Sequence, residues 1–264
     1  MKITALVENR SACGLKTKHG LALYIETDNH KILFDLGPDD TLFTNAAKCG
    51  IDLKSVDTVI ISHGHYDHGG ALELFLKHNT TAKVFIQRQA FEKHYSKVLF
   101  WKKEIGLAAD LQVQPQIILL DGDHQIDAEL FLFTVAPGKR KCYSEVNDDL
   151  YNATGRDDFS HEQNLIVCEN VKVLFMGCGH NGVVNILEAA APYRPQVCIG
   201  GYHLQNPVTK KTVAPELLAK IAQELAKYEI EYYTCHCTGQ KAYNFLAGKL
   251  PNMRYLSCGE TLTF

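Results

Sequence analysis

A dense group of metal-ligand residue types stands in the stretch 59–70, which reads VIISHGHYDHGG. His63, His65, Asp67 and His68 follow directly on an apolar run. In an extended segment, side chains two residues apart leave on the same side, so the imidazoles of His63 and His65 point together. Asp67 and His68 follow on a turn and can reach a second position. Because imidazole and carboxylate groups bind divalent metals, this spacing serves two metal ions held a few ångströms apart.

The elements around these ligands must bring them to one place. The apolar run before His63 predicts a buried strand, and Gly69 and Gly70 allow a helix to begin after the ligands. Strand-like segments rich in Val, Ile, Leu and Phe recur in both halves of the chain, with helical patterns between them. We expect helices over 41–49, 70–77, 90–105, 183–191 and 214–227. This order predicts an α/β (α+β) fold, a four-layer αββα sandwich of two sheets packed face to face with helices outside.

No Pro/Ser/Gly-rich linker divides the chain, so we expect a single domain over 1–264. Two segments lack a strong strand or helix pattern. The segment 90–111 carries Trp101 and several lysines and is expected to form a helical flap. The segment 138–160 is polar, and a connection of that length is usually functional or disordered, so we expect an active-site loop there.

Composition narrows the class of partner. The chain has 264 residues, 46% of them hydrophobic, and a formal charge of −3, with no long basic or acidic run. We therefore expect a small-molecule substrate, no nucleic acid and no membrane partner. No stretch approaches the roughly 18 to 20 apolar residues of a membrane span, so we expect a cytoplasmic protein. The nine cysteines show no framework spacing apart from the close pair Cys235 and Cys237, which favours reduced thiols.

The motif H-x-H-x-D-H at 63–68 resembles the signature of the metallo-β-lactamase superfamily. Upstream, ILFDLG places Asp35 at a strand end, where the superfamily carries a carboxylate that supports metal-bound histidines. Downstream, LFMGCGHNGVVNIL, IGGYHL and CHCTG occur in the order found in one narrower family. In these motifs the chain is similar to the dihydropterin ribofuranosylaminobenzene-phosphate synthase-like metallohydrolases.

The resemblance implies the metallo-β-lactamase type of sandwich and a binuclear metal site. The six implied metal ligands are His63, His65, Asp67, His68, His180 and His236. His63 and His65 would bind one metal and Asp67 and His68 the other. His180 and His236 each follow a strand, and loops at strand ends converge on a site. The structural alternatives are a helix cap at His180 and a packing role at His236.

Two residues leave alternatives open. Most superfamily members place a bridging aspartate where this chain has Cys178, which either ligates, favouring zinc, or is a buried thiol. His161 precedes a strand at the place where many members keep their third histidine. It therefore competes with His180 for one role, and we favour His180. The other histidine is expected to contact substrate or a bound water.

Further residues are candidates for contact with substrate. His203, at another strand end, could donate a proton to a leaving group or bind an anion, with a structural role as the alternative; with Asp67 it is our candidate catalytic residue. Lys139 and Arg140 lie in a short basic run, which is either a solvated face or a phosphate site. The histidines without ligand-type neighbours are expected at the surface or in packing; these are His19, His30, His78, His94 and His124.

We therefore expect a binuclear metallohydrolase with two divalent metal ions, zinc before manganese or iron. Metals in this arrangement lower the pKa of a bridging water and hold it as hydroxide. The expected substrate is a small, anionic phosphorylated or cyclic ester, phosphodiester-like and conceivably pterin-related. The alternatives are a non-catalytic metal-containing binding or sensor protein and a diiron redox protein of the same superfamily. The complete ligand set argues against the first, and Cys178 at the usual carboxylate position argues against the second.

Overall fold

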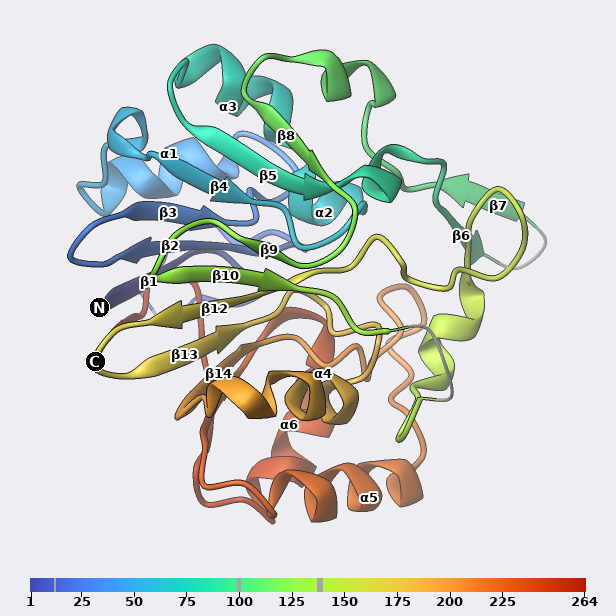
Figure 1. The fold of residues 1–264 in the computed structure, drawn as a ribbon. Coiled ribbons are helices and arrows are strands. Elements are labelled where there is room, and N and C mark those ends of the chain that lie inside the picture. Colours follow the sequence, from blue (N-terminus) through green and yellow to red (C-terminus); the bar gives the residue numbers. More distant parts are fainter. Residues whose placement is uncertain (12, 99–100, 137–139) are drawn as a thin grey trace.

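The computed structural model describes residues 1–11, 13–98, 101–136 and 140–264, which form two large sheets with helices on their outer faces (Figure 1). The first sheet has seven strands in the order β17-β1-β2-β3-β4-β5-β8. Its strands are β1 (Lys2–Val7), β2 (Ala22–Glu26), β3 (Lys31–Phe34), β4 (Thr58–Ile60), β5 (Lys83–Gln87), β8 (Ile117–Leu120) and β17 (Thr261–Thr263). From β3 to β8 the neighbouring strands are parallel. The short strand β4 is buried along its whole length, as the continuous apolar run in its sequence predicts.

The second sheet also has seven strands, in the order β16-β15-β14-β13-β12-β10-β9. Its strands are β9 (His124–Gln125), β10 (Leu130–Phe133), β12 (Asn164–Cys168), β13 (Lys172–Phe175), β14 (Val197–Gly200), β15 (Glu231–Thr234) and β16 (Met253–Tyr255). Here the strands from β13 to β16 are parallel. Each sheet therefore contains a parallel portion whose carboxyl ends can present side chains at one edge.

The helices cover the outer face of each sheet. They are α1 (Thr41–Lys48), α2 (Tyr66–Gly69), α3 (Leu72–His78), α4 (Val183–Ala190), α5 (Pro215–Leu225) and α6 (Gln240–Ala247). Figure 1 shows α1 and α3 on the side of the first sheet and α4, α5 and α6 on the side of the second. One apolar cluster joins each sheet to its helices, and a third cluster fills the space between the sheets, where the rings of Phe34 and Phe175 lie 5.9 Å apart. The predicted four-layer αββα sandwich is confirmed.

Four of the five expected helices form. α1, α3, α4 and α5 lie within one or two residues of their predicted ranges. α5 shows why: Pro215 occupies its first turn, and its buried residues recur at helical spacing along one face. The sequence did not predict the short helix α2, which begins at Tyr66, before the helix expected from Gly70. Asp67 and His68 therefore lie on a helical turn.

The prediction of a helical flap over 90–111 is wrong. This segment contains the antiparallel strands β6 (Tyr95–Val98) and β7 (Trp101–Glu104), followed by a short 3-10 helix at Ala109–Val113. β6 also pairs with β11 (Leu150–Tyr151), which makes a small third sheet. The Lys- and Glu-rich sequence has good helix propensity, but pairing with β11 more than fifty residues away decides the structure. Strand β11 and a 3-10 helix at Glu145–Asp149 lie within the described part of the expected active-site loop, residues 140–160.

Candidate metal centre

The ligand-type residues meet where the parallel strands end. In the first sheet, Asp35 follows β3 and His63 comes three residues after β4. In the second sheet, His180, His203 and His236 come shortly after β13, β14 and β15 respectively. The carboxyl ends of parallel strands form the crevice in which open α/β sheets bind ligands. The sandwich thus brings ligands from both halves of the chain to one edge.

A first ligand group consists of His63, His65 and His180. One ring nitrogen of each lies within 4.8 Å of the others, and all three residues are buried. Within the described residues, the Nε2 atom of each ring has no hydrogen-bond partner. Burial, followed by the charges of neighbouring histidines, holds the pKa of His63 and of His180 well below its usual range. The imidazoles are therefore neutral, which is the form that binds a metal.

Partners behind the rings fix which nitrogen faces the centre. His180 donates from Nδ1 to Asn147 Oδ1 at 2.9 Å. Ser62 donates its hydroxyl proton to Asp35 Oδ2 at 2.7 Å, so its oxygen accepts from His63 Nδ1 at 2.9 Å. Both histidines therefore carry their proton on Nδ1 and present the lone pair of Nε2. This is how partners in the outer shell orient metal-binding histidines.

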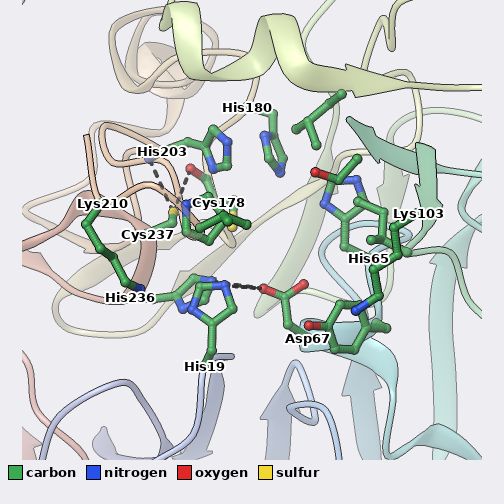
Figure 2. Close-up of a pocket in the computed structure, with 16 residues that line it drawn as sticks. His19, His65, Asp67, Lys103, Cys178, His180, His203, Lys210, His236 and Cys237 are labelled. Atoms are coloured by element: carbon green, nitrogen blue, oxygen red, sulfur yellow. Dashed lines mark hydrogen bonds and ion pairs between the residues drawn. The ribbon is translucent and has the colours of Figure 1, made fainter. Parts of the chain in front are cut away.

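A second ligand group consists of Asp67, His68 and His236. Figure 2 shows Asp67 facing His236, and Asp67 Oδ2 lies 3.3 Å from His236 Nε2. The Nε2 atoms of His68 and His236 lie 3.2 Å apart. His68 donates from Nδ1 to Asp35 Oδ2 at 2.6 Å, and His236 donates from Nδ1 to Asn9 Oδ1 at 3.0 Å. Two nitrogens and a carboxylate oxygen thus converge on a second centre.

This second centre attracts positive charge. Burial lowers the pKa of His68, but the carboxylates of Asp35 and Asp67 raise it more, and the net pKa is about 9. Without metal, His68 therefore carries a positive charge beside these two carboxylates. A divalent cation would satisfy the same carboxylates in place of that charge.

Cys178 lies between the two groups. Its Sγ is 3.2 Å from His68 Nε2, and the residue belongs both to the ligand-type group of His63 and His68 and to that of His180 and His203. Burial raises the pKa of the Cys178 thiol well above its usual value. Cys237 lies beside it, with Sγ accepting the His203 backbone N–H at 3.2 Å. The sequence marked Cys237 only as half of a close cysteine pair.

His161 belongs to a hydrogen-bonded network behind His65. Its Nδ1 accepts the backbone N–H of Gly64 at 2.9 Å, so the proton sits on Nε2 and is directed at Asp157 Oδ2, 3.3 Å away. Asp157 also contacts His94 Nδ1 at 2.9 Å, and all of these side chains are buried. With both nitrogens engaged, His161 presents no lone pair to a metal. The structure groups His180 with His63 and His65, whereas His161 lies in a separate ligand-type group with His65, His94 and Asp157. His94 is therefore a buried partner rather than an isolated histidine.

His203 faces the pocket with an uncommitted imidazole. The residue is buried with φ +47°, and its backbone is held by the bond to Cys237 and by Ser144 Oγ, which donates to the His203 carbonyl at 2.6 Å. Among the described residues, neither ring nitrogen of His203 has a hydrogen-bond partner. Its ring centre lies 4.3 Å from that of His180.

Of the two basic candidates for substrate contact, the structure describes Arg140. Lys139 lies outside the described residues. Arg140 does not line the pocket, because its guanidinium donates to Asn181 Oδ1 at 2.8 Å and to the Asp158 carbonyl. Arg140 therefore ties the loop around 158 to the turn before α4. This placement corrects our candidate phosphate contact at Arg140.

The ligand groups open into a pocket of about 290 Å³ (Figure 2). Its lining includes three residues that the sequence did not select: His19, Lys103 and Lys210. His19 Nε2 lies 3.4 Å from Asp67 Oδ2, so the expectation that His19 is isolated is wrong. These residues come from three separate segments, and no local spacing in the sequence connects them with the H-x-H-x-D-H motif.

Fold and ligand arrangement together define the class. The family model of the metallo-β-lactamase superfamily matches residues 16–140 of the chain. The chain is 26% identical to Methanocaldococcus jannaschii 7,8-dihydropterin-6-methyl-4-(beta-D-ribofuranosyl)-aminobenzene-5'-phosphate synthase, covering 94% of this chain and 90% of that one. It is 22% identical to an uncharacterised protein of the same organism, covering 98% and 99%. The resemblance to the narrower synthase-like family is thus confirmed.

Solved structures agree. Tm1679, called a metal-dependent hydrolase of the beta-lactamase superfamily, matches with a TM-score of 0.82 and 26% identity over 100% of this chain and 99% of that one. Human tRNase Z, short form, matches with a TM-score of 0.54 and 14% identity over 100% and 99%, which shows the shared fold alone. The absence of a nucleic-acid partner stays a prediction. No helix of the described residues is long and apolar enough to cross a bilayer.

Proposed function

We propose that the protein is a binuclear metal-dependent hydrolase of a small anionic ester, with a phosphodiester as the preferred class. The observation that carries this proposal is the meeting of two oriented ligand groups, from both halves of the chain, at the floor of one pocket. The match to the superfamily model and the name of Tm1679 support it. A pocket of about 290 Å³ suits a metabolite rather than a polymer.

The residues fit two divalent ions. The buried, unpaired Nε2 atoms of His63, His65 and His180 fit one ion, because a buried nitrogen without a partner is costly unless a ligand satisfies it. Asp67, His68 and His236 fit the second. Cys178, close to both groups, fits as the anionic ligand that most relatives supply with an aspartate. A donor set of imidazoles with a thiolate favours zinc over manganese or iron.

Different residues of the chain would hold the metals, orient the metal ligands and contact the substrate. The two groups would hold the metals, which when bound would supply the nucleophile by lowering the pKa of a water toward neutrality. Asp35, Asn9 and Asn147 hold the ligand rings in their binding orientation. His203, with both ring nitrogens uncommitted, faces the substrate and can donate a proton to the departing oxygen or hydrogen-bond the anion. Apolar walls formed by Ile105 and Leu150 limit access of bulk water.

The test measures hydrolysis of chromogenic phosphomonoester, phosphodiester and lactone substrates by zinc-loaded protein. We expect turnover of the phosphodiester by wild type, and a loss of at least about a hundredfold in His65→Ala, which removes a ligand. His78→Ala changes an exposed histidine outside the site and serves as the control. Equal inactivity of wild type and His65→Ala across the whole panel, with zinc fully bound, would contradict the proposal.

A further inference from the structure

Two lysines flank the pocket above the ligand groups. Lys103 comes from β7, and Lys210 comes from the turn between β14 and α5. Figure 2 shows them on opposite sides of the pocket, with the ligand side chains between them. Across the described residues, neither ammonium group takes part in an ion pair. Two charged groups thus face one cavity without an acidic partner of their own.

The backbone directs Lys103 into the pocket. β6 and β7 pair in register, with Ser96 opposite Lys103, and Ser96 also lines the pocket. Successive side chains of a strand point to opposite faces, so Lys102 points away. Its ammonium lies 4.0 Å from the ring centre of Tyr151. Lys103 lies on the pocket side, 5.6 Å from the ring centre of Tyr66.

Lys210 is presented by a tightly bonded turn. Its backbone N–H donates to the Asn206 carbonyl at 3.0 Å, and its own carbonyl accepts from Gln205 Nε2 at 3.2 Å. Lys210 has φ +57°, a left-handed conformation that costs a lysine free energy and is maintained by these bonds. The next residue, Lys211, lines a different hollow of the surface.

Among the described residues, the two ammonium groups have no ion pair with a carboxylate that would compete with an anion for them. Asp67 is the carboxylate that lines this pocket, and it is already engaged by His19 and His236. The lining of this pocket also includes the apolar residues Ile105, Pro207 and Val208. A lysine binds phosphate or carboxylate as a point charge, without the fixed geometry of arginine.

We propose that Lys103 and Lys210 bind a second anionic group of the substrate, a phosphate or a carboxylate, at the end away from the ester that is cleaved. This inference rests on the proposed hydrolase function and narrows the substrate to an ester with a separate negative charge. The pair takes the role that the sequence suggested for Lys139 and Arg140. The two lysines are specificity residues and take no part in bond cleavage.

Two matched phosphodiesters test the inference. Both carry a p-nitrophenyl leaving group, and their second arms have equal length but end in a carboxylate or in a methyl group. We expect zinc-loaded wild type to prefer the carboxylate diester by about tenfold or more in kcat/KM, which corresponds to about 1.4 kcal/mol. Lys103→Met and Lys210→Met should each reduce that ratio several-fold through a higher KM for the carboxylate diester.

Neighbouring lysines supply the controls. Lys102→Met and Lys211→Met remove the same charge from the same segments but from outside the pocket, and we expect them to keep the preference of wild type. A preference that is absent in wild type, or that survives in the Lys103→Met, Lys210→Met double variant, would overturn the inference. Circular dichroism of each variant establishes that it is folded.

A separate binding experiment distinguishes failure of the hydrolase proposal from failure of the anion-site inference. If zinc-loaded wild type cleaves neither diester, the hydrolase proposal fails, and the subsite is measured by calorimetric binding of inorganic pyrophosphate to metal-free protein. Weaker binding to the double variant than to wild type and to Lys211→Met supports an anion site at Lys103 and Lys210. Equal binding to all three proteins overturns it.

Discussion

At the scale of single residues, the centre depends on which nitrogen of each imidazole carries the proton. Asp35 and Asn9 accept from Nδ1 of His68 and His236, and Asn147 accepts from His180, so each Nε2 is left to face the centre. His161 shows the converse, because the amide of Gly64 occupies its Nδ1 and Asp157 faces its Nε2. The pattern of hydrogen bonds therefore adds to residue type a criterion for choosing the candidate ligands among these histidines.

Cys178 provides a prediction at this scale. If its thiolate binds the metals, protein loaded with cobalt should show an intense near-ultraviolet thiolate-to-cobalt absorption band, and Cys178→Ser should lack it. Cys198→Ser is the matched control, because Cys198 is equally buried but belongs to the apolar cluster under α4. A band of equal intensity in wild type and Cys178→Ser would show that Cys178 is a buried thiol and not a ligand.

At the scale of elements, the ligand loop after β4 is held against the segment that leads into the β6–β7 hairpin. A Cβ atom added at Gly64 would collide with the backbone of Ala90 and lie 2.9 Å from His94 Nε2. Only a glycine lets the loop carrying His63 and His65 pack this closely. The geometry of these two ligands thus depends on the neighbouring segment as well as on their own spacing.

Gly64→Ala should therefore displace the ligand loop. We expect a loss of about 1 to 3 kcal/mol in the free energy of unfolding from overpacking, together with weaker zinc binding. Denaturant unfolding and competition with a chromogenic chelator measure the two effects. Gly155→Ala is the control, because a Cβ there meets no atom within 4 Å. Zinc affinity of Gly64→Ala equal to that of wild type would refute this account of the loop.

The sequence predicts those parts of the fold and site that are local. His63 to His68 stand together in the chain, and the apolar run before them shows that they end a strand, so this half of the centre is visible without coordinates. The hairpin at 95–104 was missed because its strands pair with each other and with the distant β11, and tertiary pairing of this kind outweighs helix propensity. His19 and Lys210 were missed because residues isolated in the sequence come to line the pocket only when the sandwich folds.

At the scale of the whole molecule, the centre joins two halves of the sandwich. Asp67 and His68 come from the first half, and His180 and His236 from the second. A metal bound by both halves stabilises the folded chain and not the unfolded one, by an amount that grows with the metal concentration relative to its dissociation constant. Removal of metal by a chelator should therefore lower the melting temperature as well as the activity.

The edge opposite the centre contains a second link between the halves. His30, in the turn between β2 and β3, contacts Asp57 Oδ1 at 2.9 Å and Asp127 Oδ2 at 2.8 Å. Asp127 lies in the turn between β9 and β10 of the second sheet. Partial burial lowers the pKa of His30, but the two carboxylates outweigh it and leave the pKa raised.

This link should depend on pH. A raised folded pKa means that the contribution of His30 is fully present below its unfolded pKa of about 6.5 and is lost as the pH rises through the folded value. We expect His30→Gln to destabilise the protein by up to about 1 kcal/mol near pH 5.5 and by less near pH 9. Urea unfolding at both pH values measures the difference, with His78→Gln as the control. A larger loss near pH 9 would show that the sign of this linkage is wrong.

The most direct test of the central claim is the rate of phosphodiester hydrolysis while metal-free protein is titrated with zinc. The rate should rise with bound zinc and become constant at about two ions per chain, because both ligand groups are needed to hold the nucleophile and the substrate. If two zinc ions bind and the rate stays at that of the metal-free protein, or if the metal-free protein already has the full rate, the centre is not that of a metal-dependent hydrolase.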